Sequence, residues 1–226
     1  MTTTNAPEDE TNLKAVPPSD TKFTILATMA TTLLSSLESA NLLPSKIIPD
    51  NFTPRVNLAI NFPSLSPVEG SLARVSQVNQ QPTISISSPT PSPSSQSFTI
   101  LLIDPDAPTP DDPKFAYWRH WIVSNISTSS PSFDASDIVK SGTTVTPYLA
   151  PGPKDESGPH RYLFLLFSEP EGFEVKKEDV GGDEFVERRS FGAREWVEKC
   201  GLELVGVQWM RGVGDGWVEG EGKSEL

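Results

Sequence analysis

The chain has 226 residues and a formal net charge of −12, which is long enough for one domain with a hydrophobic core and terminal extensions. An acidic chain repels nucleic-acid backbones and anionic lipid surfaces at long range, so its charge argues against both as general partners. The single cysteine, Cys200, excludes an internal disulfide and fits a reducing compartment. We expect a monomer in the cytoplasm, with the vacuole as the alternative location.

The N-terminal region predicts a polar arm followed by a helix. Residues 1–20 are polar, acidic and closed by Pro17-Pro18, which is typical of a flexible arm and lacks the basic start of a signal peptide. No segment approaches the roughly 20 apolar residues of a membrane span. Ser19 or Asp20 can cap the helix, and Asn41 can end it. Apolar residues recur at a helical period and predict a helix on the outside of the domain: Ile25, Met29, Leu33, Leu34 and Leu37.

Strands are expected to dominate the rest of the chain. Apolar and polar residues alternate in the first two predicted strands, and the later ones are β-prone apolar runs. The predicted strands are residues 56–60, 83–86, 98–103, 120–123, 160–167 and 204–210.

The segments between these strands carry few apolar anchors. They are a Ser/Pro-rich loop at 87–97, a variable stretch at 127–153 and a charged excursion at 168–189. A helix is predicted over 191–199, with Gly201 placed to stop it. The sequence thus predicts one mainly β domain over residues 21–212, followed by a flexible, acidic, Gly-rich tail over 213–226.

Polar residues with chemical potential occur where turns meet strands. Asp104 and Asp106 follow one predicted strand, and His120 and His160, the only histidines, each enter another. We expect them to share a pocket, because β proteins commonly place ligand groups at such positions. Imidazole and backbone N–H groups donate to phosphate or carboxylate oxygens, and a nearby aspartate raises the pKa of a histidine. The pattern predicts an anion site.

The neighbouring aromatic and basic residues have simpler expected roles. On a strand, Trp118 shares a face with His120 and can wall the pocket, whereas Trp121 takes the other face and fills the core. By the same alternation, Tyr162 shares a face with His160. Arg119 and Arg161 point away from the histidines and are expected to be structural ion-pair partners.

Enzymatic alternatives have weaker support. Asp104, His120 and His160 form the ligand set of a non-haem iron or zinc site, but the close His-x-Asp pair of the iron triad is missing. No G-x-S-x-G elbow indicates a serine hydrolase. Cys200 is expected to be a packed thiol, because no histidine lies near it in sequence. Residues 220–224 resemble the end of a phosphate-binding loop, but the first glycine of that motif is missing from the residues before them.

Two motifs give the chain a family resemblance. Asp104 to Pro108 match D-P-D-x-P, Trp118 to His120 match W-x-H, and Gly158 to Tyr162 match G-x-H-R-Y. Together they resemble the phosphatidylethanolamine-binding proteins over residues 20–212. The resemblance implies two antiparallel sheets with a few peripheral helices and a pocket for phosphate-like groups, including phospholipid headgroups. Carried over, the pocket residues are Asp104, Asp106, Pro108, Trp118, His120, His160 and Tyr162, with Pro153 at the rim.

The long N-terminal region and the G-P-H-R-Y form of the second motif are most similar to the fungal carboxypeptidase Y inhibitor branch of that family. This similarity implies a non-catalytic protein without a cofactor, acting as an inhibitor of a serine carboxypeptidase or as a signalling modulator. Residues 1–20 would be the inhibitory element. The loop from Pro151 to His160 is longer and more acidic than in animal members, through Asp155 and Glu156. The alternative is a metal-dependent hydrolase or oxygenase that uses Asp104, His120 and His160.

Overall fold

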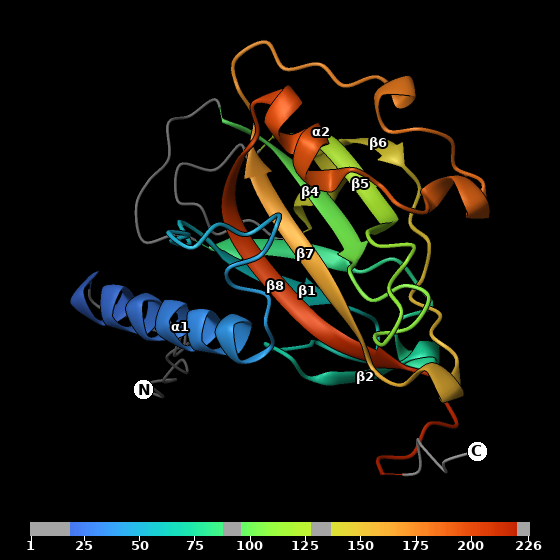
Figure 1. Ribbon diagram of the computed structural model, residues 1–226. Coiled ribbons are helices and arrows are strands. Elements are labelled where there is room, and N and C mark those ends of the chain that lie inside the picture. The colour runs from blue at the N-terminus through green and yellow to red at the C-terminus, as the bar shows by residue number, and fades with distance from the viewer. Residues whose placement is uncertain (1–18, 88–95, 128–136, 221–226) are drawn as a thin grey trace, which may run out of the picture.

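The computed structural model describes residues 19–87, 96–127 and 137–220, with side chains from Thr28 onward. Most of the predicted N-terminal arm and of the Ser/Pro loop lies outside these residues. Within them, two α-helices accompany eight strands, α1 (Ser19–Ser39) and α2 (Ala193–Cys200). The prediction of a mainly β protein is therefore confirmed, and both helices lie at the periphery (Figure 1).

The strands form two sheets, as the family resemblance implied. The larger sheet has the order β2-β8-β7-β4-β5-β6, and all its neighbours are antiparallel except β2 and β8. Its strands are β2 (Leu72–Arg74), β4 (Ser97–Asp104), β5 (Trp118–Ser127), β6 (Thr143–Thr146), β7 (His160–Ser168) and β8 (Glu203–Val213). The second sheet pairs β1 (Asn57–Asn61) with β3 (Thr83–Ser87).

The large sheet is covered on both faces, which explains the continuous apolar runs of β4 and β7. An inner core between the two sheets includes Leu58, Ile84, Ile100 and Phe164. An outer core on the opposite face includes Leu101. Successive residues of a strand point to opposite faces, so a strand buried on both sides needs apolar residues at every position.

Helix α1 packs on the outside of the domain, as predicted (Figure 1). Leu33 and Leu37 enter the outer core, and the Trp209 Nε1–H donates to the Ser36 hydroxyl at 2.8 Å. Asn41 ends the helix with a φ of 53°, the left-handed conformation that asparagine tolerates. Of the helices described, none is both long and apolar enough to cross a membrane.

Helix α2 begins two residues later than predicted and ends at Gly201, whose φ is 63°. Ala193 and Trp196 bury one side of it in the outer core. Cys200 packs beside them, and burial raises the pKa of its thiol, as expected for a packed cysteine rather than a nucleophile.

Two edge strands are not predicted by the sequence pattern, and part of the expected tail packs against the domain. Strands β2 and β6 have only three and four residues, too few to show a period. The last strand continues to Val213, beyond the predicted domain end. Beyond it, Arg74 Nη1 donates to the carbonyls of Gly214, Asp215 and Trp217. The described residues 213–220 therefore begin as strand and fold back onto the domain instead of extending as a free tail.

Candidate functional site

Three strand ends meet at one edge of the large sheet. Asp104 at the end of β4 pairs with Trp118 at the start of β5, and Ile103 pairs with Leu163 near the start of β7. This antiparallel register brings the two motifs together, because the end of β4 lies between the starts of its neighbours. A cavity of about 410 Å³ opens there. Seven of the eight predicted pocket residues line it: Asp104, Pro108, Trp118, His120, Pro153, His160 and Tyr162.

Asp104 is the centre of the polar network. Its Oδ1 accepts the Asp106 backbone N–H at 2.6 Å, and its Oδ2 lies 2.8 Å from His160 Nδ1. The Tyr162 hydroxyl also hydrogen-bonds to this carboxyl group, and burial raises the pKa of Tyr162 well above 10. Tyr162 therefore stays protonated and donates. Asp104 thus orients both His160 and Tyr162, and it leaves the His160 Nε2 without a protein partner.

His120 is held by the backbone of the rim. Its Nδ1 lies 2.7 Å from the Leu149 carbonyl oxygen, so Nδ1 carries the proton and Nε2 presents a lone pair when the ring is neutral. Burial lowers the pKa of His120, and the opposing effect of Asp104 is smaller. The expectation that a nearby aspartate makes this imidazole cationic was therefore wrong for His120, since desolvation dominates.

The pKa of His120 predicts a pH-dependent stability. The native pKa lies below 6.5, so between these two values the unfolded chain binds a proton that the native chain does not. The free energy of unfolding should therefore fall as the pH falls below 6.5, by up to about 1.4 kcal/mol per pH unit. Denaturant titrations between pH 5 and pH 7 should give a shallower slope for His120→Gln than for the unaltered protein. Equal slopes would contradict this assignment.

A β-bulge changes which residues share a face of β5. Leu102 pairs with Trp121 and Ile103 with Arg119, so the register skips His120. Trp121 packs in the inner core, which also contains Tyr162, and the Tyr162 ring centroid is 5.3 Å from that of His120. Trp121 does fill the core, but the prediction that it faces away from His120 was wrong, because simple alternation does not hold across a bulge.

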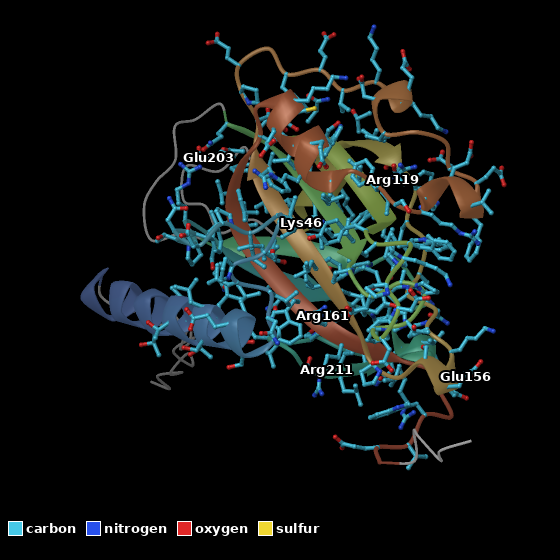
Figure 2. The ribbon with its side chains drawn as sticks, viewed as in Figure 1. Lys46, Arg119, Glu156, Arg161, Glu203 and Arg211 are labelled. Atoms are coloured by element: carbon cyan, nitrogen blue, oxygen red, sulfur yellow. The ribbon has the colours of Figure 1, made fainter. Side chains whose placement is uncertain are left out.

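Asp106 is the one predicted pocket residue that does not line the cavity. Its carboxylate accepts the Arg161 backbone N–H at 2.7 Å and bonds the Arg161 guanidinium through Nε and Nη2. Arg161 also donates to the Ala40 carbonyl after α1. Figure 2 shows Arg161 beside Arg211, its neighbour in the β7–β8 register. Asp106 therefore has a structural ion pair, and the structural role predicted for Arg161 is confirmed.

Arg119 differs from its prediction as an ion-pair partner. Its guanidinium donates to the backbone carbonyls of Val180 and Gly182, and no carboxylate in the described part of the chain pairs with it. Its ring contact is with Phe191, at 5.2 Å. The charged excursion at 168–189 thus contributes backbone acceptors to a buried guanidinium group.

The same excursion provides a pocket residue that the sequence analysis missed. Phe185 is 60% exposed, lines the cavity and contacts Trp118 with ring centroids 4.6 Å apart. Its signal in the sequence is an apolar Phe185-Val186 pair within a charged stretch. The rim also includes Leu149, Ala150, Gly152, Lys154, Glu156 and Ser157, and Glu156 is visible near the start of β7 in Figure 2.

The metal-site alternative gains no geometric support. Across residues 19–87, 96–127 and 137–220, no three His, Cys, Asp or Glu side chains are grouped so that they could hold a metal ion. His160 directs its Nδ1 to Asp104, and His120 directs its Nδ1 to a carbonyl. Of the three proposed ligands, Asp104 and His160 therefore bond each other, and His120 bonds the Leu149 carbonyl.

The fold and the site together define a class: a mainly β protein with a cavity at the ends of its central strands. A family model described as "Phosphatidylethanolamine-binding protein" matches residues 50–203. The chain therefore belongs to the phosphatidylethanolamine-binding protein family.

Among curated proteins, the carboxypeptidase Y inhibitor of Saccharomyces cerevisiae is 30% identical over 121 residues, which are 48% of this chain and 55% of that protein. The match thus spans about half the length of this relative. A crystal structure of carboxypeptidase Y inhibitor complexed with its cognate proteinase has a TM-score of 0.70 at 24% identity, covering 82% of this chain and 97% of that one. A phosphatidylethanolamine-binding protein from Plasmodium vivax has a TM-score of 0.63 at 22% identity, covering 80% and 97%. These structures share the fold.

Proposed function

We propose that this chain is a non-catalytic binding protein whose pocket takes an oxyanion and which inhibits a serine carboxypeptidase. The observation that carries the first half is the Asp104 network, which holds His160 and Tyr162 beside His120 in one cavity. The second half is supported by family membership and by similarity to a curated inhibitor.

The pocket chemistry favours a phosphate that retains a proton. Neutral His120 offers the Nε2 lone pair as an acceptor, which suits a P–OH group, and the Trp118 indole N–H has no protein partner. The buried Asp104 carboxylate repels a fully ionised ligand. Three hydrogen-bond donors to this carboxylate reduce the repulsion. A phosphate monoester supplies both the P–OH donor and the acceptors, whereas a phosphoethanolamine diester supplies the acceptors and donates only through its ammonium group.

Titration with inorganic phosphate and phosphorylethanolamine tests the pocket. We expect saturable binding by the unaltered protein near pH 6, where monoprotonated and diprotonated phosphate are both present. Binding should weaken at least about tenfold in His120→Ala, because the variant loses a hydrogen bond to an ionised ligand. Asp112→Ala is the control, since Asp112 is exposed in the same β4–β5 loop and does not line the cavity. Equal affinities of the two variants would rule out this pocket as the binding site.

Inhibition is proposed to depend on the N-terminal arm. The curated relative is named as an inhibitor, and the similar crystal structure is titled as its complex with a proteinase. We expect the full chain to inhibit a vacuolar-type serine carboxypeptidase, and deletion of residues 1–18 to weaken inhibition by at least about 100-fold. This deletion leaves α1 intact, because the helix begins at Ser19. Deletion of residues 221–226 is the control. If the full chain did not inhibit the carboxypeptidase, the inhibitor proposal would be refuted. The pocket proposal would not be affected.

A further inference from the structure

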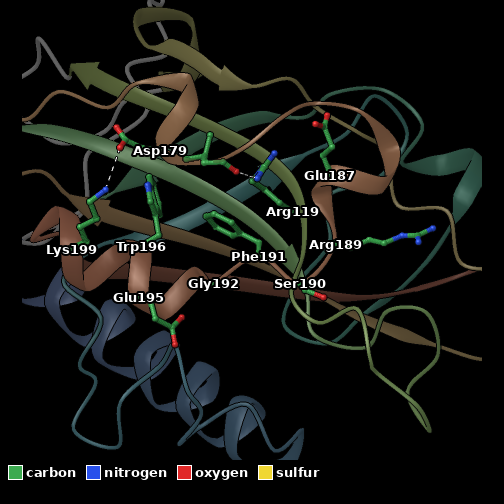
Figure 3. Close-up of a pocket in the computed structure, with 11 residues that line it drawn as sticks. Arg119, Asp179, Glu187, Arg189, Ser190, Phe191, Gly192, Glu195, Trp196 and Lys199 are labelled. Atoms are coloured by element: carbon green, nitrogen blue, oxygen red, sulfur yellow. Dashed lines mark hydrogen bonds and ion pairs between the residues drawn. The ribbon is translucent and has the colours of Figure 1, made fainter.

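A second cavity lies on the other side of β5 from the pocket. It has a volume of about 360 Å³ and lies between α2 and the segment that precedes it. Arg119 lines this cavity, whereas its neighbours Trp118 and His120 line the pocket. Figure 3 shows Phe191 between the Trp196 indole and Arg119, so an aromatic surface joins two groups that carry N–H donors. The two cavities therefore lie back to back across one strand.

Arg119 carries a buried positive charge, and no described carboxylate is in contact with it. It is 1% exposed, and its Nη1 and Nη2 atoms donate to backbone carbonyls. Its Nε–H has no partner among the residues that the structure describes. Arg188, a second buried cation nearby, also donates to carbonyl oxygens, including that of His120. Among the described residues no carboxylate contacts either guanidinium group, and the nearby Asp183 is paired with Lys177, so the two cations favour an anion beside them.

Trp196 adds an unused donor on the same cavity. The side chain is 4% exposed, and its Nε1–H has no hydrogen-bond partner within the described part of the chain. Helix α2 starts beside it after Gly192, which has no side chain to cap the first turn. Buried N–H groups are normally satisfied, so orphan donors on two side chains of one cavity point to a ligand that accepts from them.

The acidic residues of the cavity do not cancel its preference for an anion. Asp179, Glu187 and Glu195 are all exposed, whereas Arg119 is buried. Asp179 is paired with Lys199 at 3.3 Å, and Glu187 accepts the Glu184 backbone N–H at 3.0 Å. Water and salt screen exposed carboxylates, while a buried charge is screened much less.

We propose that this cavity is a second anion site, which takes a small carboxylate or phosphate group against Arg119 and Trp196. The apolar faces of Phe191 and Trp196 suit a ligand whose anionic group is attached to an apolar body. The two cavities share no lining residue: Arg119 lines this one, whereas Trp118 and His120 line the pocket, and the segment of residues 185–192 contributes to both.

The indole N–H resonances of the five tryptophans allow both sites to be observed in one NMR titration. Trp196→Phe and Trp118→Phe assign the two reporters by the loss of their peaks. Inorganic phosphate and acetate are the two probes, each added at constant ionic strength against chloride. We expect the Trp196 peak to shift saturably with at least one probe, with the same midpoint in the His120→Ala background. A Trp196 peak that stays still, or that moves equally with chloride, would overturn the second site.

Trp196→Phe also tests the donor itself, since it keeps the ring and removes the N–H. Affinity followed at the Gly192 backbone amide should fall at least about tenfold, the loss expected for one hydrogen bond to an anion. Trp121→Phe is the matched control, because it removes another orphan indole N–H that lies in the inner core. Equal affinities in these two variants would refute the role of Trp196. A moving Trp118 peak with a still Trp196 peak would support only the first pocket, and the reverse would support only the second site.

Discussion

Replacement of Asp104 by alanine is expected to lower the free energy of unfolding by about 3–5 kcal/mol and to abolish phosphate binding. The substitution leaves the His160 Nδ1–H, the Tyr162 hydroxyl and the Asp106 N–H without their shared acceptor. All three lie in or against the buried core, where an unsatisfied donor carries its full desolvation cost. Urea denaturation measures the first effect, and phosphate titration measures the second.

Asp104→Asn separates the two effects. The amide keeps one acceptor oxygen and the size of the side chain, so the loss of stability should be smaller than in Asp104→Ala. Phosphate affinity should still change, because the amide alters the charge of the pocket and the hydrogen bond to His160. If Asp104→Ala unfolded at the same urea concentration as the unaltered protein, Asp104 would not be the centre of the network.

Replacement of Asp106 by alanine should cost about 2–3 kcal/mol of stability and leave phosphate affinity within about twofold. Asp106 is buried and binds Arg161 through its guanidinium and backbone N–H, so the variant leaves a half-buried guanidinium without its carboxylate. The cost is lower than for Asp104, since Arg161 reaches solvent and keeps the Ala40 carbonyl as an acceptor. The same two measurements check this expectation.

Lys114→Ala provides the comparison for Asp106→Ala. Lys114 forms an exposed ion pair with Asp112 in the same loop, and such pairs contribute at most about 1 kcal/mol. Phosphate affinity could instead fall strongly in Asp106→Ala and stay unchanged in the Asp112→Ala control. That result would show that Asp106 belongs to the binding pocket, as the family resemblance implied.

The most accurate sequence predictions concern segments with a strong local pattern. The apolar runs of β4 and β7 predicted buried strands, the period of Leu33 and Leu37 predicted α1, and Asn41 predicted its end. Strands β2 and β6 left no comparable signal. Three or four residues bound by a neighbouring strand owe their conformation to pairing, and local preference contributes little.

The candidate site was predictable because two motifs lie at strand ends, and antiparallel pairing of β4 with β5 and β7 brings such ends together. Its rim was less predictable. Leu149 and Phe185 reach the cavity from loops whose course depends on tertiary contacts, and neither carries a motif. Sequence spacing also placed Trp121 opposite His120, and only the register of β5 with β4 revealed the bulge.

By itself the sequence determined the fold class, the family and seven residues of the cavity, because these depend on hydrophobic pattern and motif order. Only the tertiary structure decided how the charges are used. Asp104 and Asp106 are two residues apart in one motif, yet Asp104 orients His160 in the pocket and Asp106 binds Arg161. His120 is neutral because burial outweighs its acidic neighbour, and Arg119 meets carbonyls instead of a carboxylate. Charge state and partner depend on burial and on residues distant in sequence, and neither is encoded in local spacing.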